Sequence, residues 1–219
     1  MAQHSNRETL LQHGLSLVHE RGFAGSSVRD IVQAAGVPQG SFTNHFASKE
    51  AFGLEVLERY HLAAREVISA TLSNPALTPL RRLRAWCEVQ LARLKSDDMR
   101  RGCLYGNFGV EASDQSEAIR KRVAEMFREN QDSIAQCLQA AVAAGELAPE
   151  TDTSDVAGFL LSSLQGAVML SKAERSAEPV ERFLRVVFSG LLPPPDPGGG
   201  RRSRRSAKAA KGKTRRSTR

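Results

Sequence analysis

The chain of 219 residues has few cysteines and no long apolar run. Its three cysteines, Cys87, Cys103 and Cys137, are odd in number, widely spaced and form no CxxC pair, which argues against a disulfide framework or a bound metal. No apolar stretch approaches the roughly eighteen residues of a membrane span, and the N-terminus lacks the basic and then apolar order of a signal peptide. We therefore expect a cytoplasmic protein of one or two domains that has no membrane partner.

Patterns that carry catalysis are also missing. The five histidines show no HExxH spacing, and the chain has neither a G-x-S-x-G elbow nor a P-loop. Residues 106–109 (GNFG) follow no strand and so do not form a phosphate loop. Because nothing places an acid, a base and a nucleophile together, we predict that the protein is not an enzyme and needs no cofactor.

The net positive charge of the chain comes from one segment. Ten Lys or Arg residues and no acid lie in residues 198–219, while the formal charge of the whole chain is +7, so the remainder is slightly negative. This segment follows a run of prolines and glycines and holds no large apolar residue, which predicts a disordered basic tail over residues 193–219. The tail fits two roles: a solubilising segment, or a polycation that adds salt-sensitive affinity for any nucleic acid.

The rest of the chain reads as all-α, because it lacks alternating apolar and polar stretches and has few β-branched residues. A short helix is predicted to begin at Ser27, where Asp30 completes a capping box, and to end near Gly36. A second short helix is predicted over about residues 38–45, and Ser48 caps a longer one. Two short helices joined by a tight turn with glycine are typical of a helix-turn-helix motif.

The second short helix carries the residues that a DNA-reading helix needs. Small residues at its start let the backbone approach a phosphate, and Phe42 and Phe46, four apart, can dock on the protein's own core. We expect the following side chains to face a DNA groove: Gln39, Ser41, Thr43, Asn44 and His45. Lys49 can pair with a phosphate. A solvated turn can have a similar composition, but the flanking helices favour a reading helix.

Residues 7–60 resemble the DNA-binding domain of the TetR/AcrR family of bacterial transcriptional repressors. The matching segments are residues 20–23 (ERGF), 26–37 (SSVRDIVQAAGV) and above all 40–52 (GSFTNHFASKEAF). The family pattern G-x-[FYL]-x-x-H-F-x-[SN]-K-[ED] fits from Gly40 to Glu50, with Thr43 where tyrosine is common, a departure that bears on which phosphate or base is touched. The resemblance implies phosphate contacts from Ser27 and Lys49. It also implies a helix-turn-helix domain of three helices (residues 1–52) and a helical dimerisation and effector domain (residues 53–192).

Four further helices are predicted in the C-terminal part of the chain: one from Thr78–Pro79, then about residues 114–145, 153–172 and 178–191. The last two carry apolar residues on more than one stripe, which favours a four-helix interface between two copies of the chain. An ordinary monomeric core is the alternative. A twofold dimer would hold its reading helices roughly 34 Å apart, or a multiple of that, and bind a near-palindromic operator.

Residues 99–113 (MRRGCLYGNFGVEAS) form an unusual segment, in which three glycines break the helical pattern. Arg100 and Arg101 precede Cys103, and if a helix starts there, its positive end also favours the reactive thiolate. The segment resembles the RGCLxGNxG sequence of a TetR subgroup that responds to electrophiles or unsaturated small acids. This implies a sensor at Cys103, in an effector site with Tyr105 and Asn107. Separately, the lone tryptophan, Trp86, could line an effector cavity. Alternatively, Cys103 and Trp86 are packing residues.

These observations lead to one hypothesis and one alternative. The hypothesis is a homodimeric transcriptional repressor that binds double-stranded operator DNA and responds to a small-molecule or electrophilic effector. The alternative is an architectural protein that binds nucleic acid without sequence preference through its basic tail. Operator discrimination that survives deletion of residues 198–219 would favour the repressor.

Overall fold

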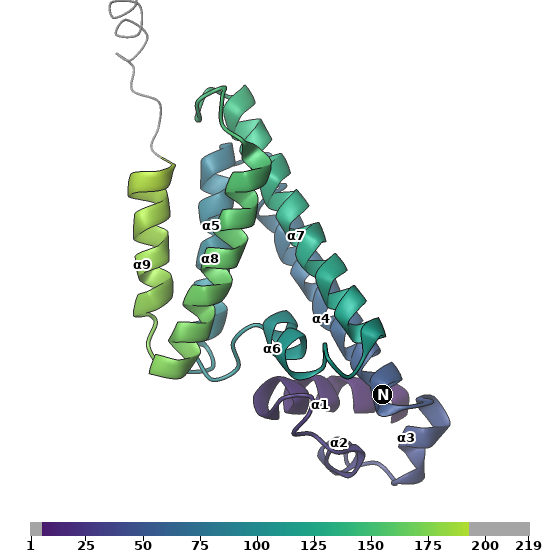
Figure 1. The fold of residues 1–219 in the computed structure, drawn as a ribbon. Helices are drawn as coiled ribbons and strands as arrows, with labels where there is room; N and C mark the ends of the chain where they lie inside the picture. The colour runs from purple at the N-terminus through teal and green to yellow at the C-terminus, as the bar shows by residue number, and fades with distance from the viewer. Residues whose placement is uncertain (1–5, 193–219) are drawn as a thin grey trace, which may run out of the picture.

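The computed structural model describes residues 6–192, which fold into helices without any strand, as predicted (Figure 1). The helices are α1 (Asn6–Arg21), α2 (Val28–Ala35), α3 (Gly40–His45), α4 (Lys49–Ala70), α5 (Pro79–Lys95), α6 (Leu104–Glu111), α7 (Glu117–Ala143), α8 (Thr153–Glu174) and α9 (Glu178–Val186), which continues as a π-helical turn over Val187–Leu191. The predicted basic tail, residues 193–219, lies outside the described residues.

The helix-turn-helix begins and ends where the capping residues predict. The Ser27 side chain accepts a hydrogen bond from the backbone N–H of Asp30, and the Asp30 carboxylate accepts one from the backbone N–H of Ser27. Gly36 ends α2 in the left-handed conformation with φ 63°, which glycine adopts without strain. Only α3 differs from the prediction, because it begins at Gly40 rather than Pro38 and spans six residues.

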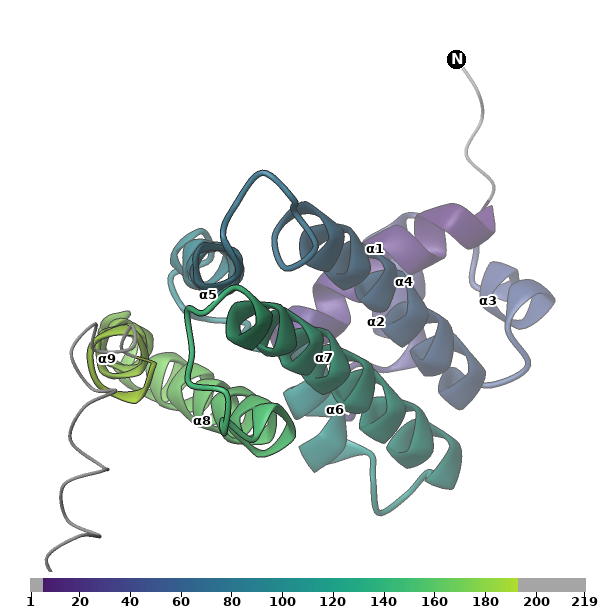
Figure 2. The same ribbon diagram turned by 90° about the horizontal axis from the view of Figure 1, so that it is seen from above.

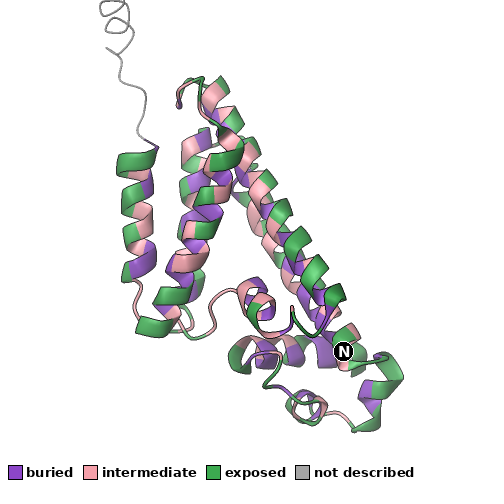
Figure 3. Ribbon diagram, in the orientation of Figure 1, coloured by how far each residue is buried: buried purple, intermediate pink, exposed green. Residues whose placement is uncertain are grey.

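An aromatic cluster fixes the orientation of α3. The Phe42 and Phe46 rings lie 5.4 Å and 5.1 Å from the ring of Phe52, which belongs to α4. Gly14 of α1 makes room for this cluster, since a Cβ atom there would lie 2.3 Å from the Phe52 ring. All three phenylalanines are buried, so α3 presents its opposite face to solvent (Figure 3).

The hydrophobic core consists of two clusters, and long helices such as α7 contribute residues to both. The first contains α1–α3 and continues into α4, α6 and the start of α7, with Val56, Leu104 and Met126 fully buried. The second is formed mainly by α5, α7, α8 and α9. Seen from above, α8 and α9 lie on the side of the molecule away from α1–α3 (Figure 2). The domain boundary at residues 52 and 53 stays a prediction, because α4 and its core residues cross it.

The glycine-rich segment interrupts the helical pattern only in part: residues 96–103 separate α5 from α6, and a short helix then starts directly after Cys103, where the sequence analysis had considered a start. Leu104 and Phe108, four residues apart and both buried, anchor α6 between the two clusters. Gly109 faces α7, and a Cβ atom there would make an ordinary contact with Val123 at 3.7 Å. The helix predicted from about residue 114 therefore begins later, at Glu117, with Ser116 as its N-cap.

Helix α8 is both long and apolar. Among residues 6–192 it alone reaches the length and hydropathy of a membrane span, with a mean hydropathy of 1.3 over an 18-residue window, where the sequence had suggested none. One such helix is weak evidence, since core helices of soluble proteins have the same composition. Leu160 and Leu164 pack in the second cluster, whereas Phe159, Met169 and Leu170 are exposed.

Candidate nucleic-acid interface and internal cavity

The exposed face of α3 carries most of the predicted groove-facing residues. Gln39, Thr43, Asn44 and His45 are all exposed. The Thr43 hydroxyl donates to the carbonyl of Gly40 at 3.1 Å, whereas the side chains of Asn44 and His45 make no hydrogen bond to any residue within 6–192. A Cβ atom added at Gly36 or Gly40 would meet nothing within 4 Å. This face is therefore open to a partner and has free donors and acceptors.

Two of the predicted contact residues are already engaged within the protein. Ser41 is 6% exposed and its hydroxyl accepts a hydrogen bond from the Asn6 side chain at 3.3 Å, so its side chain does not face outward as predicted. Ser27 is exposed, but its hydroxyl donates to Asp30 at 2.5 Å as part of the capping box. A phosphate contact from Ser27 stays a prediction. The one proton of the Ser27 hydroxyl is already donated to Asp30.

Lys49 lies at the base of the motif. Its ammonium group sits 4.6 Å from the centre of the Phe23 ring, and the residue is half-buried. Burial lowers the pKa of Lys49, while the carboxylates of Glu111 and Asp30 oppose this change. The Phe23 ring thus holds the Lys49 ammonium group at the edge of the interface. A contact between this group and a DNA phosphate stays a prediction.

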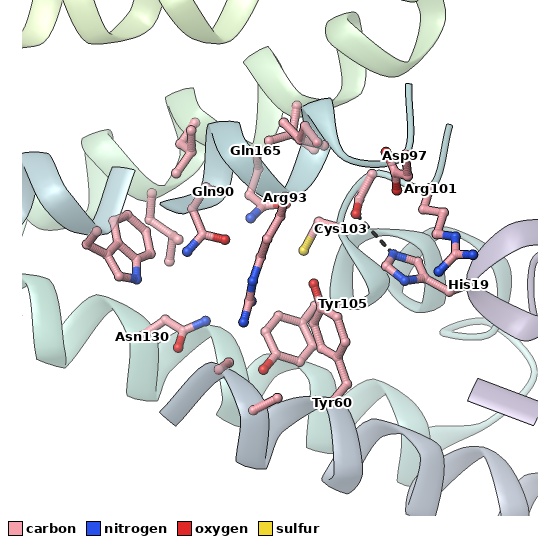
Figure 4. A pocket seen from close by; sticks show the side chains of 18 of the residues that line it. His19, Tyr60, Gln90, Arg93, Asp97, Arg101, Cys103, Tyr105, Asn130 and Gln165 are labelled. Atoms are coloured by element: carbon pink, nitrogen blue, oxygen red, sulfur yellow. Dashed lines mark hydrogen bonds between the residues drawn. The ribbon is translucent and has the colours of Figure 1, made fainter. Parts of the chain in front are cut away.

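A cavity of about 340 Å³ opens between the DNA-binding helices and the second cluster (Figure 4). Side chains from α1, α4, α5, α6, α7 and α8 line it. Of the four predicted effector residues, Trp86, Cys103 and Tyr105 belong to its wall. Asn107 does not, since its side chain donates to the carbonyl of Arg101 at 3.0 Å and so holds the loop before α6.

Cys103 lies at the N-cap of α6, but its thiol is not activated as expected. Burial raises the pKa of Cys103, and hydrogen bonds from the backbone N–H groups of Gly106 and Tyr105 do not outweigh it. The predicted stabilisation of the thiolate is therefore wrong, because desolvation of a charged sulfur exceeds the effect of the helix end. Cys87 and Cys137 are buried, with pKa values raised to about 12 and about 11, as core cysteines should be.

The structure adds cavity residues that the sequence analysis missed. His19 of α1 lies with its Nε2 atom 3.0 Å from the carbonyl oxygen of Gly102, and burial lowers the pKa of this imidazole. Asn130 of α7 is 93% buried, at 7% exposure, although it is polar. The sequence held a signal for Asn130, because it occupies the same apolar stripe as Met126 and Ile134, four residues to either side.

A hydrogen-bond chain leads from the cavity wall through the buried His61 to charged groups at the surface. The hydroxyl of Tyr105 lies 2.9 Å from Nδ1 of the buried His61, whose Nε2 atom lies 2.8 Å from the Glu129 carboxylate. Arg122 in turn pairs with Glu129 at 3.2 Å. This chain holds the Tyr105 ring in place and so fixes one wall of the cavity.

Helix α6 connects the cavity to the helix-turn-helix. Glu111 at its end accepts a hydrogen bond from the backbone N–H of Ala24 at 3.0 Å, in the turn before α2. A Cβ atom at Gly22 would lie 2.6 Å from the same carboxylate, so the turn and Glu111 are in close contact. Ser116, just after α6, donates to Glu50 of α4. A shift of α6 would therefore act on the turn before α2 and, through Ser116, on the start of α4.

Fold and sites together define a helix-turn-helix DNA-binding protein with a helical domain that encloses a cavity. Residues 10–56 match the bacterial regulatory proteins of the tetR family, and residues 79–187 match the tetracyclin repressor-like C-terminal domain. The chain belongs to the TetR family and is a DNA-binding transcriptional regulator.

Relatives support this assignment over most of the chain. The chain is 38% identical to the HTH-type transcriptional repressor DhaR of Mycobacterium sp. (strain GP1), over 88% of this chain and 96% of that one. The crystal structure of reduced Escherichia coli NemR is 31% identical, with a TM-score of 0.78 over 85% of this chain and 96% of that one. A cysteine mutant of the regulator CifR, complexed with a 26-bp operator, is 26% identical, with a TM-score of 0.71 over 81% of this chain and 94% of that one. These relatives give no support to the architectural alternative.

Proposed function

We propose that the protein is a cytoplasmic repressor that binds a near-palindromic operator as a homodimer and leaves it when an effector occupies the cavity or modifies Cys103. The observation that carries this proposal is the position of the cavity. Its wall includes His19 of α1, Cys103 at the start of α6 and residues of α8, so one bound molecule touches both the DNA-binding part and the outer helices.

The exposed apolar side chains support the homodimer. Most of the large hydrophobic residues that are exposed within 6–192 lie on α8 and on α9 with its π-helical end: Phe159, Met169, Leu170, Val186 and Leu191. Single exposed apolar residues are ordinary, but a cluster on neighbouring helices marks an interface. A second copy, related by a twofold axis, would cover this surface and orient two α3 helices toward successive major grooves.

We expect the response to electrophiles to depend on access to the Cys103 thiol through the cavity and not on a low pKa of that thiol. Cys103 lines the cavity, so a small electrophile that enters it reaches the sulfur. With an activated alkene such as N-ethylmaleimide, the sulfur would add to one alkene carbon. The S–H bond and the C=C π bond would break, a C–S bond would form, and the proton would end on the neighbouring carbon. Because burial raises the thiol pKa, we expect slow reaction with reagents in solution and faster reaction with molecules that bind in the cavity.

The geometry offers a route from the cavity to the DNA. A molecule that displaces Cys103 moves the start of α6 and the adjacent Gly102, whose carbonyl contacts His19. The far end of α6 holds Ala24 through Glu111. For a reversible effector, linkage requires that effector and operator weaken each other's binding by the same factor.

An operator-release experiment tests the proposal. Genomic footprinting supplies the operator, and fluorescence anisotropy measures its release after treatment with N-ethylmaleimide. We expect the wild type to dissociate and Cys103→Ser to stay bound, with Cys87→Ala as the control for a buried thiol. If Cys103→Ser releases DNA as readily as the wild type, the thiol has no part in sensing. If no variant selects an operator, the repressor proposal itself fails.

A further inference from the structure

A buried histidine of α4 connects the cavity wall with the surface of α7. His61 is 2% exposed, its Nδ1 atom lies 2.9 Å from the Tyr105 hydroxyl, and its Nε2 atom lies 2.8 Å from the Glu129 carboxylate. Tyr105 is among the side chains that surround the cavity (Figure 4), whereas Glu129 is exposed. The imidazole therefore stands between a wall residue and a charged group that solvent reaches.

The partners of His61 fix where the protons lie when the imidazole is neutral. Burial alone would raise the pKa of Glu129, but hydrogen bonds from His61 and Arg122 lower it, so this carboxylate is ionised and can only accept. The Nε2 atom must then carry the one ring proton, which leaves Nδ1 as an acceptor. The Tyr105 hydroxyl therefore donates to Nδ1 and has only its lone pairs left for a molecule in the cavity.

Protonation of His61 reverses the hydrogen bond to Tyr105. Both ring nitrogens then carry a proton, so Nδ1–H donates to the tyrosine oxygen. Burial raises the pKa of Tyr105, so the hydroxyl keeps its own proton, which must point elsewhere. Within residues 6–192 this hydroxyl has no second hydrogen-bond partner. The acceptor for the Tyr105 proton must therefore be water or a bound molecule.

Charged groups around His61 accommodate a positive imidazolium. Those that face it come from two helices: Glu58 of α4, and Glu129 and Arg122 of α7. Helices α1 and α5 also pack against α4, but their His19 and Arg93 lie near the adjacent Tyr60 and make no hydrogen bond or ion pair with His61. Carboxylates outnumber cations in this group, so the charged imidazole has a counter-ion.

We propose that His61 is a proton-dependent switch of the cavity wall: when it is protonated, the Tyr105 hydroxyl donates into the cavity and favours ligands that carry a neutral hydrogen-bond acceptor. When His61 is neutral, the same hydroxyl can only accept. This inference rests on the proposed function of the cavity as the effector site and describes how pH regulates that site. By linkage, a ligand that accepts from Tyr105 takes up protons as it binds.

Two probes of similar shape separate this hydrogen bond from simple filling of the cavity. Cyclohexanone has one acceptor oxygen, which methylenecyclohexane replaces by a CH₂ group, and neither is an activated alkene that Cys103 could attack. Trp86 is the chain's only tryptophan and lines the cavity, so a change in its emission reports binding. We expect cyclohexanone to bind about three- to tenfold more tightly at about pH 5.5 than at about pH 8, and methylenecyclohexane to bind equally at both.

Four variants assign the pH dependence to His61. Tyr105→Phe keeps the buried ring but removes the hydroxyl, so it should abolish the pH dependence for cyclohexanone, as should His61→Gln. His19→Gln should keep it, although His19 also lines the cavity, and so should His13→Gln, which replaces an exposed histidine. A purely structural His61 would change stability in its variant and leave the pH dependence of binding unchanged.

Nitrogen NMR of the imidazole rings tests the proton positions without any ligand. We expect neutral His61 to carry its proton on Nε2 at about pH 8 and to become protonated on both nitrogens as the pH falls.

The inference is overturned if cyclohexanone binds equally at both pH values or does not bind at about pH 5.5. It is also overturned if His19→Gln removes the pH dependence, or if neutral His61 carries its proton on Nδ1. None of these measurements uses DNA, and the repressor proposal is judged by operator selection and by its release through Cys103. A failure of the switch is therefore distinguishable from a failure of the repressor proposal.

Discussion

Asn44 and His45 are the residues of α3 that combine exposure with side chains free of hydrogen bonds to residues 6–192. We expect Asn44→Ala and His45→Ala each to weaken operator binding by about 1–3 kcal/mol, the usual cost of a lost base contact. Anisotropy with the operator measures this loss, and circular dichroism should show unchanged helix content. Unchanged affinity in both variants would contradict their assignment.

Ser41 provides the matched control on the same helix. Its hydroxyl is buried and bonded to Asn6, so Ser41→Ala should lower the free energy of unfolding by about 1 kcal/mol. The ratio of operator to nonspecific affinity should stay the same. A loss of discrimination in Ser41→Ala would instead place this residue in the groove.

His19 makes the stability of the protein depend on pH. Burial lowers its pKa from 6.5, the Gly102 carbonyl opposes this, and the nearby Arg101 lowers it further. The unfolded chain therefore binds more protons than the folded one below about pH 6.5, and the free energy of unfolding should fall as the pH decreases from 6.5 toward the folded pKa. Urea unfolding at several pH values measures the slope. His19→Gln should reduce it, whereas His13→Gln, an exposed histidine of the same helix, should not.

At the scale of helices, the capping residues made most boundaries predictable from the sequence. Ser27, Ser48 and Thr78 each precede the first residue of a helix, Pro79 is the first residue of α5, and Gly145 follows the end of α7 with φ 73°. Such signals are local, because a cap bonds to an amide three residues away. The extent of helix α6 could not be predicted from the sequence, because its glycines have low helix propensity and packing against α7 overrides that preference.

A substitution at Gly40 tests whether the start of α3 lies against DNA. A Cβ atom there would meet nothing within 4 Å, so the protein's own packing does not require glycine. Gly40→Ala should keep or raise the free energy of unfolding, by up to about 1 kcal/mol, since alanine favours the helix. Operator affinity should nevertheless fall, because the added methyl group separates the backbone from a phosphate. Thermal unfolding and anisotropy measure the two effects, and unchanged affinity would place this end of α3 away from DNA.

At the scale of the whole molecule, the sequence analysis named three residues of the cavity wall, Trp86, Cys103 and Tyr105, but could not show that they meet. His19, Trp86, Cys103 and Asn130 come from four helices, and no local spacing relates them. Only the packing of α4, α5, α7 and α8 brings them together. The RGCLxGNxG resemblance indicated Cys103 and Tyr105, but it could not show that burial would raise the thiol pKa, which depends on groups distant in sequence.

The exposed apolar surface of α8 predicts that operator binding depends on dimerisation. Phe159 and Met169 are 56% and 66% exposed, so replacing both with glutamate should leave the fold of one chain intact while introducing charges into the interface. We expect the double variant to sediment as a monomer and to lose at least about a hundredfold in operator affinity, because it contacts one half-site at a time. Val110→Glu is the control, since Val110 is 86% exposed but lies on α6. A double variant that remains dimeric would exclude this surface as the interface, and a monomer with full affinity would exclude the twofold mode of DNA binding.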